Sequence, residues 1–292
     1  MQQYKINLHI LEPCNYKCKH CFSKFNSKSI LNYQEWLKII KNCEASINVC
    51  EYNIAGGEPL LYKDLKMLLS SIDKPISLIT NGSKINNDFI ENIANHFYMI
   101  GISIDSFDYN TNLNIGRCDN NKKTINFDEL KKKLIDLKNK YPNCKLKINT
   151  VVLQENKNEI LWKYIKQLPI DKWKILKSKK CVNETFSNEK YIVNNDEFKQ
   201  FVFNNLNICL DNYQYSKTLK IDNIDIVIEP SLNDSYLFID SNGYLIMNSN
   251  DNNEQIIDFK NNIDKNCLSK VRFNKQKYLS RYDNFTKKNK GE

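Results

Sequence analysis

The sequence predicts an α/β fold built on a parallel sheet, because strand-like and helix-like segments alternate through roughly its first 180 residues. Apolar, β-branched stretches predict six strands, at residues 4–11, 50–55, 76–80, 97–104, 144–153 and 173–177. Apolar residues at helical spacing predict helices between them, at residues 33–45, 63–72, 87–96, 127–140 and 160–168. Such alternation implies parallel strands with right-handed crossovers. An incomplete barrel and an open doubly wound sheet would both satisfy this pattern.

The alternation stops near residue 180. A short helix is expected at residues 196–205, a strand at 224–228, and a hairpin in which Asn242-Gly243 turns residues 236–240 back into 244–247. We therefore divide the chain into an α/β unit at 1–180 and a C-terminal extension at 181–292, rather than two domains. The last stretch, about 20 residues, is basic and weakly patterned, and we expect a mobile tail there.

Composition narrows the classes of function. The chain has 292 residues, 41% of them hydrophobic, and a net charge of +9 that comes mostly from lysine. A nucleic-acid-binding protein would need a basic stripe interleaved with aromatic residues, which is not evident, so a polyanionic small molecule fits the charge better. There is no run of about 18 apolar residues and no recognisable signal peptide, so we expect a soluble, cytoplasmic protein. We also expect a monomer.

Three cysteines follow the first predicted strand in a C-x3-C-x2-C pattern, at Cys14, Cys18 and Cys21. Three such thiolates can hold three irons of a four-iron, four-sulfur cluster and leave the fourth iron open to a small molecule. A structural zinc site would need four ligands, and no second Cys/His pair is spaced to complete one. A disulfide is disfavoured in a chain without a secretory signal. The other seven cysteines are scattered singly, as buried free thiols are.

The carboxyl ends of parallel strands gather ligands, so the residues after each strand are candidates for the site. Gly56-Gly57-Glu58-Pro59 follows the second strand. Its glycines would let the backbone approach a ligand closely, and its carboxylate could accept a hydrogen bond from an ammonium group. Alone this would be an ordinary strand-to-helix turn, but one strand after the three cysteines it is much more specific.

Together these motifs resemble the radical S-adenosylmethionine (SAM) enzymes, which form a partial (βα)6 barrel. The resemblance implies that SAM chelates the open iron, that the GGEP segment binds its methionine amine, and that electron transfer into the sulfonium releases a 5′-deoxyadenosyl radical. It further assigns Thr80, Asn81 and Ser103 to the SAM carboxylate and ribose, and Phe22 to the adenine.

Further cations lie at the later strand ends. Lys147 and Asn149 alternate along the fifth strand and so point to one face, as Lys172 and Lys174 do around the sixth. Arg117 lies in the polar loop after the fourth strand. Each lysine alone would be a solvated surface residue in this Lys-rich chain. Several of them converging on the barrel mouth suggest a triphosphate ligand.

Several segments narrow the resemblance to the viperin family, including its prokaryotic members. They are CNYKCKHCF (14–22), SIDSFDYNTNLNIGR (103–117), KINTVV (147–152), KWK (172–174) and DSYLFIDSNGYLIMN (234–248). The resemblance implies conversion of a nucleoside triphosphate (CTP, UTP or GTP) to its 3′-deoxy-3′,4′-didehydro analogue. The radical would take the C4′ hydrogen and the 3′-hydroxyl would leave as water. The product would terminate chain extension by viral polymerases, an antiviral role, and a flavodoxin- or ferredoxin-type donor would reduce the cluster.

The viperin resemblance also assigns residues. The triphosphate would contact Arg117, Lys147, Lys172 and Lys174. The substrate would also contact Asn53, Asn149 at its sugar, and Tyr236, which belongs to an extension that closes over the nucleotide. Asn149 and Tyr236 are the candidate catalytic residues. Animal viperins have Lys and Ser where Glu51 and Ala55 stand here, and Arg where Lys172 stands. A carboxylate at Glu51 would repel a phosphate if it faced the site.

Two alternatives stay open at this point. A radical SAM enzyme that modifies peptides commonly carries further cysteine clusters, whereas Cys181, Cys209 and Cys267 are isolated in the sequence. A zinc- or cluster-bearing nucleic-acid-binding module is favoured by the net charge. Metal analysis distinguishes the nucleic-acid-binding module from a radical SAM enzyme, because about four irons per chain without zinc would support the enzyme.

Overall fold

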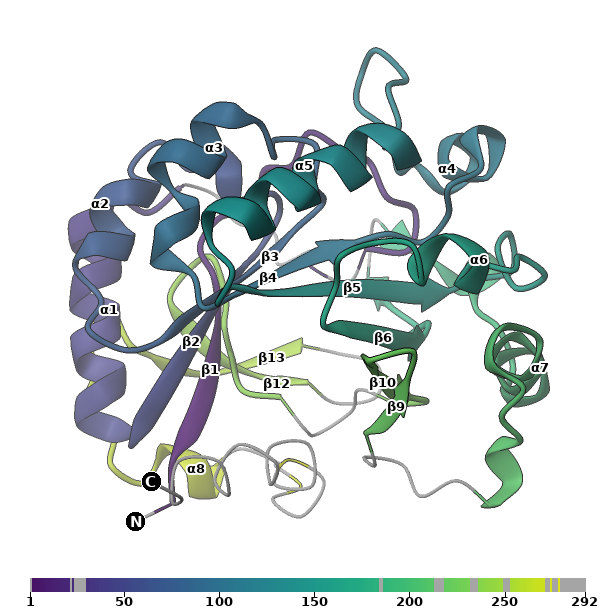
Figure 1. Ribbon diagram of the computed structural model, residues 1–292. Coiled ribbons are helices and arrows are strands. Elements are labelled where there is room, and N and C mark those ends of the chain that lie inside the picture. Colours follow the sequence, from purple (N-terminus) through teal and green to yellow (C-terminus); the bar gives the residue numbers. More distant parts are fainter. Residues whose placement is uncertain are drawn as a thin grey trace.

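A single sheet organises the protein in the computed structural model, which describes residues 2–21, 23, 30–183, 186–212, 218–231, 236–248, 253–270, 274 and 278. Its first six strands pair in parallel, each with the next one along the chain (Figure 1). They are β1 (Tyr4–His9), β2 (Val49–Ala55), β3 (Ile76–Thr80), β4 (Met99–Ser103), β5 (Lys145–Val152) and β6 (Lys172–Lys177). The predicted parallel α/β fold is thus confirmed.

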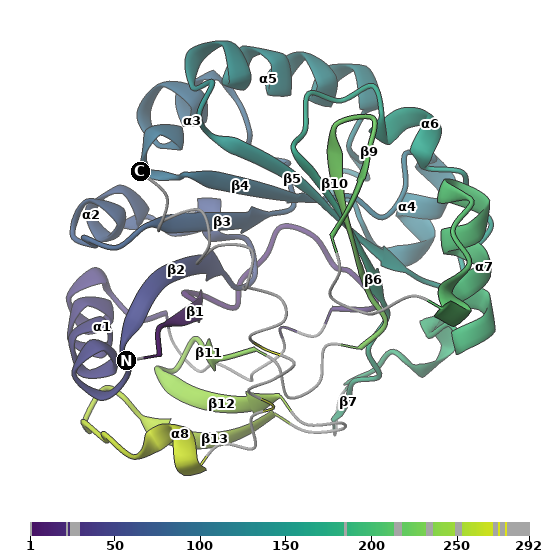
Figure 2. The ribbon, with the colours of Figure 1, turned by 60° about the horizontal axis from the view of Figure 1, so that its bottom comes forward.

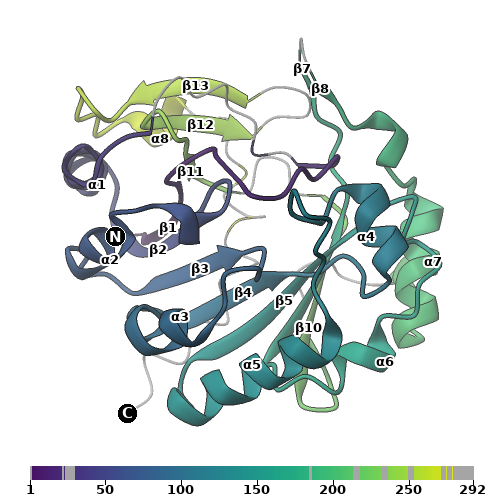
Figure 3. The same ribbon diagram turned by 90° about the horizontal axis from the view of Figure 1, so that it is seen from above.

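Helices connect these strands and lie along the outer side of the curved sheet (Figures 2 and 3). They are α1 (Tyr33–Ser46), α2 (Leu65–Ser70), α3 (Asn87–Asn92), α4 (Tyr109–Ile115), α5 (Phe127–Lys140) and α6 (Trp162–Ile165). Asparagine side chains start several of them, because each accepts a hydrogen bond from a backbone N–H of the first turn. Asn32 accepts from the Glu35 N–H at 3.0 Å and Asn126 from the Glu129 N–H at 3.1 Å. The helix α4 was not predicted, since its sequence YNTNLNI is polar.

The chain after residue 180 extends the same sheet at both edges. At one edge β10 (Ile224–Glu229) runs parallel to β6 and antiparallel to β9 (Leu219–Ile221). At the other edge β11 (Phe238–Ile239) runs parallel to β1 and begins the ribbon of β12 (Tyr244–Asn248) and β13 (Asn253–Asp258). The remaining elements of this part are β7 (Val182–Asn183), β8 (Phe186–Ser187), α7 (Asn195–Leu206) and α8 (Cys267–Lys270).

Two sequence expectations concern this part of the chain. The predicted turn at Asn242-Gly243 is present, and Gly243 has the positive φ of 88° that favours glycine. The expected tail lies almost entirely outside the described residues. None of the described helices is long and apolar enough to cross a membrane.

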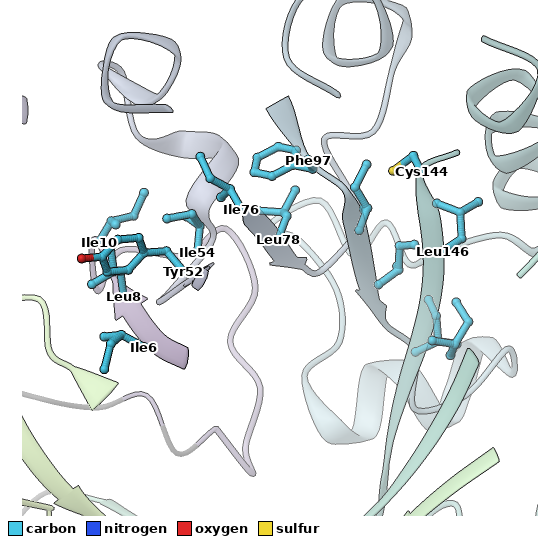
Figure 4. Packing of buried hydrophobic residues seen from close by; sticks show 14 of the residues in the cluster. Ile6, Leu8, Ile10, Tyr52, Ile54, Ile76, Leu78, Phe97, Cys144 and Leu146 are labelled. Atoms are coloured by element: carbon cyan, nitrogen blue, oxygen red, sulfur yellow. The ribbon is translucent and has the colours of Figure 1, made fainter. Parts of the chain in front are cut away.

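The apolar core lies between the sheet and the helices. Alternate strand residues such as Ile6, Leu8, Tyr52, Ile54 and Leu78 are fully buried there (Figure 4). Each such side chain contributes roughly 2 kcal/mol to folding by leaving water.

The other face of the sheet carries polar side chains, which is unusual because parallel strands buried on both faces are normally apolar throughout. Asn7 and His9 of β1 and Asn149 of β5 point to this inner face and are buried. Buried polar groups need hydrogen-bond partners. The inner face is therefore where the chain positions chemistry.

Candidate active site

A cavity of about 250 Å³ lies on the inner face of the sheet. It brings together most of the residues singled out in the sequence: Cys14, Cys18, Cys21, Asn53, Gly56, Gly57, Thr80, Asn81, Ser103, Arg117, Lys147, Asn149, Lys174 and Tyr236. Glu58 and Lys172 are not among the described residues that line it. Phe22 lies outside the described residues. Strand ends far apart in the sequence thus meet around one space, as parallel topology requires.

The cysteine loop is fixed by the unpredicted helix α4. The Lys19 N–H donates to the Ile115 carbonyl at 2.9 Å, and Gly116, which ends α4 with φ 75°, lies directly against the backbone of Lys17. A Cβ at Gly116 would lie 2.2 Å from the Lys17 carbonyl oxygen, which is an impossible contact. A glycine is therefore required where α4 ends against this loop.

The glycines of the second strand end perform a similar packing role. The Gly57 N–H donates to the Leu11 carbonyl at 2.7 Å and the Glu58 N–H to the Pro13 carbonyl at 3.0 Å. A Cβ at Gly57 would lie 2.1 Å from the Pro13 oxygen. The glycines were expected to let a ligand approach. They do line the cavity, but their tightest contact is with the backbone that leads into Cys14.

Glu58 is fully buried behind the cavity wall. Its carboxylate accepts from the Thr80 hydroxyl at 2.7 Å, the Asn81 N–H at 2.7 Å and the Leu60 N–H at 3.1 Å. Burial raises the pKa of Glu58, and these hydrogen bonds act against the increase. A carboxylate has about four acceptor positions, so one remains on Oε2. Glu58 therefore joins the ends of β2 and β3, and its binding of an amine stays a prediction.

The three cysteine thiols match the donor set of an iron–sulfur cluster. All three cysteines are free and line the same cavity. Within the described part of the chain, no three His, Cys, Asp or Glu side chains are arranged to hold one metal ion. An iron–sulfur cluster instead takes its sulfur ligands at separate corners, so its cysteines need not converge on one point. The Asn81 Nδ2 donates to the Cys14 Sγ at 3.7 Å and so helps to orient that side chain.

Among the residues that the structure describes, two buried polar atoms on the cavity wall have no hydrogen-bond partner: Nδ1 of His20 and Oδ1 of Asn149. Such orphaned groups are rare in folded proteins and are costly without a ligand. The cavity is therefore built for a polar molecule on both its cysteine side and its β5 side.

Asp105 is a site residue that the sequence analysis missed. It is buried and accepts from Arg117 Nε at 2.6 Å, from His20 Nε2 at 3.1 Å and from the Val151 N–H at 2.8 Å. Burial raises the pKa of Asp105, but Arg117 and His20 outweigh it and hold that pKa well below its usual range. Its position just after β4 was the available signal. Asp105 thus anchors both the cysteine loop and the predicted triphosphate ligand Arg117.

Lys147 is a half-buried cation on the cavity wall. It makes no hydrogen bond or ion pair with the residues that the structure describes, and across β5 and β6 it lies beside Lys172, as Asn149 lies beside Lys174. Burial, with the nearby charges of Lys174 and Lys172, lowers the pKa of Lys147 to about 7. A bound anion would reverse this destabilisation of the ammonium form.

Lys174 and Tyr236 meet on the wall beside β10. The Lys174 Nζ lies 2.5 Å from the Tyr236 hydroxyl and 2.7 Å from the Glu229 carboxylate, and it also lies 5.1 Å from the centre of the Tyr236 ring. The extension therefore contributes Tyr236 to the cavity. Lys172, in contrast, begins β6 opposite Asp225 of β10. Lys177 and Lys179 are two further cations on the lining that were not predicted.

Glu51 does not bring a carboxylate to the cavity wall. It is buried below the cavity, forms an ion pair with Lys5, and accepts hydrogen bonds from the hydroxyls of Tyr98 and Ser77. It is absent from the described lining. Glu51 is thus not a wall residue, and its ion pair with Lys5 offsets its charge, but that charge still favours the ammonium form of Lys147.

Comparison with known proteins agrees with this geometry. Residues 10–167 match the model of the radical SAM superfamily. The chain is 35% identical to an S-adenosylmethionine-dependent nucleotide dehydratase from Fibrobacter sp. strain UWH6, over 96% of this chain and 88% of that one. It is 32% identical to a protein of the same name from Selenomonas ruminantium, over 83% of this chain and 85% of that one.

Among solved structures, anSMEcpe with bound AdoMet superposes with a TM-score of 0.64 at 16% identity, covering 96% of this chain and 84% of that one. A likeness at this identity shows the fold alone. The sequence relatives, which the chain covers almost completely, decide the family. The chain belongs to the radical SAM superfamily and, within it, to the family of S-adenosylmethionine-dependent nucleotide dehydratases.

Proposed function

We propose that this protein converts a nucleoside triphosphate, CTP, UTP or GTP, to its 3′-deoxy-3′,4′-didehydro analogue, a chain terminator of viral polymerases. The observation that carries the proposal is that one cavity is lined by three cysteines and also by Lys147, Lys174 and Asn149. A radical source and a polyanion site in one cavity suit chemistry on a phosphorylated substrate. The names of the relatives point the same way.

In this proposal Cys14, Cys18 and Cys21 hold the four-iron, four-sulfur cluster. Gly56, Gly57, Thr80, Asn81 and Ser103 would hold SAM, and Glu58 would accept from its amine. The family resemblance gives the adenine contact to Phe22, which lies outside the described residues. When bound, the cluster and SAM supply a carbon-centred radical able to remove a hydrogen atom from the substrate sugar. The protein's own contribution is to hold the sugar at a fixed distance and to exclude water.

The substrate residues have distinct proposed roles. Lys147, Lys172, Lys174 and Arg117 bind the triphosphate, and Asn53 and Asn149 orient the sugar. The unpartnered Oδ1 of Asn149 is a pure acceptor, so it suits a donor such as a sugar hydroxyl. Tyr236 closes the wall over the nucleotide. Loss of the C4′ hydrogen and of the 3′-hydroxyl as water then needs one further electron and one proton.

We also propose that the protein works in the cytoplasm as a monomer and receives electrons from a flavodoxin- or ferredoxin-type donor. All ten of its cysteines are free thiols, as a reducing compartment maintains them.

The test is to reconstitute and reduce the protein, add SAM, and supply ATP, CTP, GTP and UTP separately. We expect about four irons per chain, no zinc, and 5′-deoxyadenosine formed in step with a dehydrated nucleotide. If no triphosphate changes the rate of 5′-deoxyadenosine formation, the nucleotide proposal fails. Zinc without iron would refute the radical chemistry itself.

A further inference from the structure

Glu229 is a buried carboxylate at the centre of a polar cluster that none of the preceding roles explains. Resting on the proposed function, we propose that Glu229 is a positioning residue for the nucleotide site. It fixes the ammonium of Lys174 and the hydroxyl of Tyr236 at one point of the cavity wall. The cluster comprises Lys174, Glu229 and Tyr236, and we call it the wall triad.

The sheet register explains why Glu229 is available there. β10 runs parallel to β6, with Val227 beside Lys174 and Glu229 beside Leu176. Residues paired in this way face the same side, so Glu229 and Lys174 both point to the inner face. Glu229 is 5% exposed. A carboxylate so deeply buried is stable only when paired and hydrogen-bonded.

Hydrogen-bond chemistry fixes the direction of each contact in the wall triad. Lysine only donates and an ionised glutamate only accepts. The Tyr236 hydroxyl therefore accepts from Lys174 at 2.5 Å and donates to Glu229 at 2.8 Å, while Lys174 also donates to Glu229 at 2.7 Å. The three contacts close a ring, so the tyrosine hydroxyl has one defined orientation. The carboxylate thereby links β6 to the segment after β10.

The carboxylate supports the wall and does not obstruct the site. Lys174 and Tyr236 line the cavity, whereas Glu229 is buried and is not among the described residues that line it. A carboxylate in the cavity would compete with a phosphate, and its removal would tighten binding. A carboxylate behind the wall holds the two contact groups in place, and its removal should weaken binding.

The test is the Glu229→Gln variant in the reconstituted protein. We expect the KM for the preferred triphosphate to rise about tenfold with a smaller change in kcat, because one charge-assisted partner is lost from two contact groups. Glu189→Gln is the matched control, since it makes the same change in an exposed ion pair with Lys180. We expect the control to keep the wild-type KM.

Two further variants separate positioning from a general loss of structure. Glu229→Asp keeps the charge, but its shorter side chain cannot reach both partners, so it should give an intermediate KM. It replaces Glu229→Gln in the test if that variant does not fold. Glu229→Gln combined with Tyr236→Phe should raise the KM by less than the product of the single effects, because both act through one hydrogen bond. An unchanged or lowered KM, a loss of thermal stability alone, or multiplicative effects would overturn the inference. If the wild type processes no triphosphate, the proposed function fails instead.

Discussion

Replacing Lys147 with methionine should stabilise the fold and weaken nucleotide binding at the same time. Methionine has a similar length and no charge. The folded protein removes the Lys147 amine from much of its water and places it near Lys172 and Lys174 of β6, while Glu229 of β10 and Glu51 of β2 favour its charge. Methionine removes the free-energy cost of burying a charged amine, but it also removes the proposed phosphate contact.

The magnitude follows from the pKa. Its depression from 10.5 to about 7 corresponds to an upper limit of roughly 5 kcal/mol. The unfolded chain keeps this amine protonated up to its ordinary pKa, so the destabilisation is complete below pH 7 and disappears as the pH rises toward 10.5. We therefore expect Lys147→Met to raise the free energy of unfolding by about 2 to 5 kcal/mol at pH 6 and by much less at pH 9.

The stability assay is chemical denaturation of the wild type and Lys147→Met at several pH values. Lys145→Met is the control, because Lys145 lies two residues earlier on β5 with a side chain 59% exposed. In kinetics, an anion favours the ammonium form, so the wild-type KM should rise above pH 7 by up to about tenfold per pH unit. The Lys147→Met enzyme should have a higher KM without this dependence. A destabilised variant with an unchanged KM would refute the reasoning.

Three other variants test the cysteine end of the cavity. Gly57→Ala places a Cβ 2.1 Å from the Pro13 oxygen, so the cysteine loop must shift and iron content after reconstitution should fall strongly; wild-type iron content would contradict the packing argument. Asp105→Asn leaves Arg117 and His20 without their buried charge partner, so the cluster should be lost faster on gel filtration, measured by iron and sulfide analysis. Equal retention would show that Asp105 does not anchor the loop. Cys18→Ala should abolish both 5′-deoxyadenosine and the dehydrated nucleotide, and residual formation of either would remove Cys18 from the ligand set.

Much of the parallel sheet could be predicted because each strand carries its own local signal. The predicted strand at residues 76–80 coincides with β3, and the predicted helix at 127–140 with α5. The helix α4 escaped because it has few apolar residues to show a helical period. Its signals were the Asp108 cap, which accepts from the Thr111 N–H at 2.7 Å, and the stop at Gly116.

The candidate site was predictable where strand ends reveal it and hidden where it depends on long-range pairing. Cys14 and Lys147 follow from motif and alternation. The role of Glu229 does not follow from the sequence, because Glu229 reaches Lys174 only through the pairing of β10 with β6, about 50 residues apart in the chain. The position of Glu51 likewise depended on Lys5 and Tyr98, which only the folded sheet brings to it.

Isotope transfer tests the central claim most directly. The reconstituted, reduced protein is given SAM and its preferred triphosphate labelled with deuterium at C4′. If the radical acts on the sugar as proposed, the deuterium should appear in 5′-deoxyadenosine, in equal amount with an unlabelled dehydrated nucleotide. Formation of 5′-deoxyadenosine without deuterium, at a rate that the nucleotide does not change, would contradict the account.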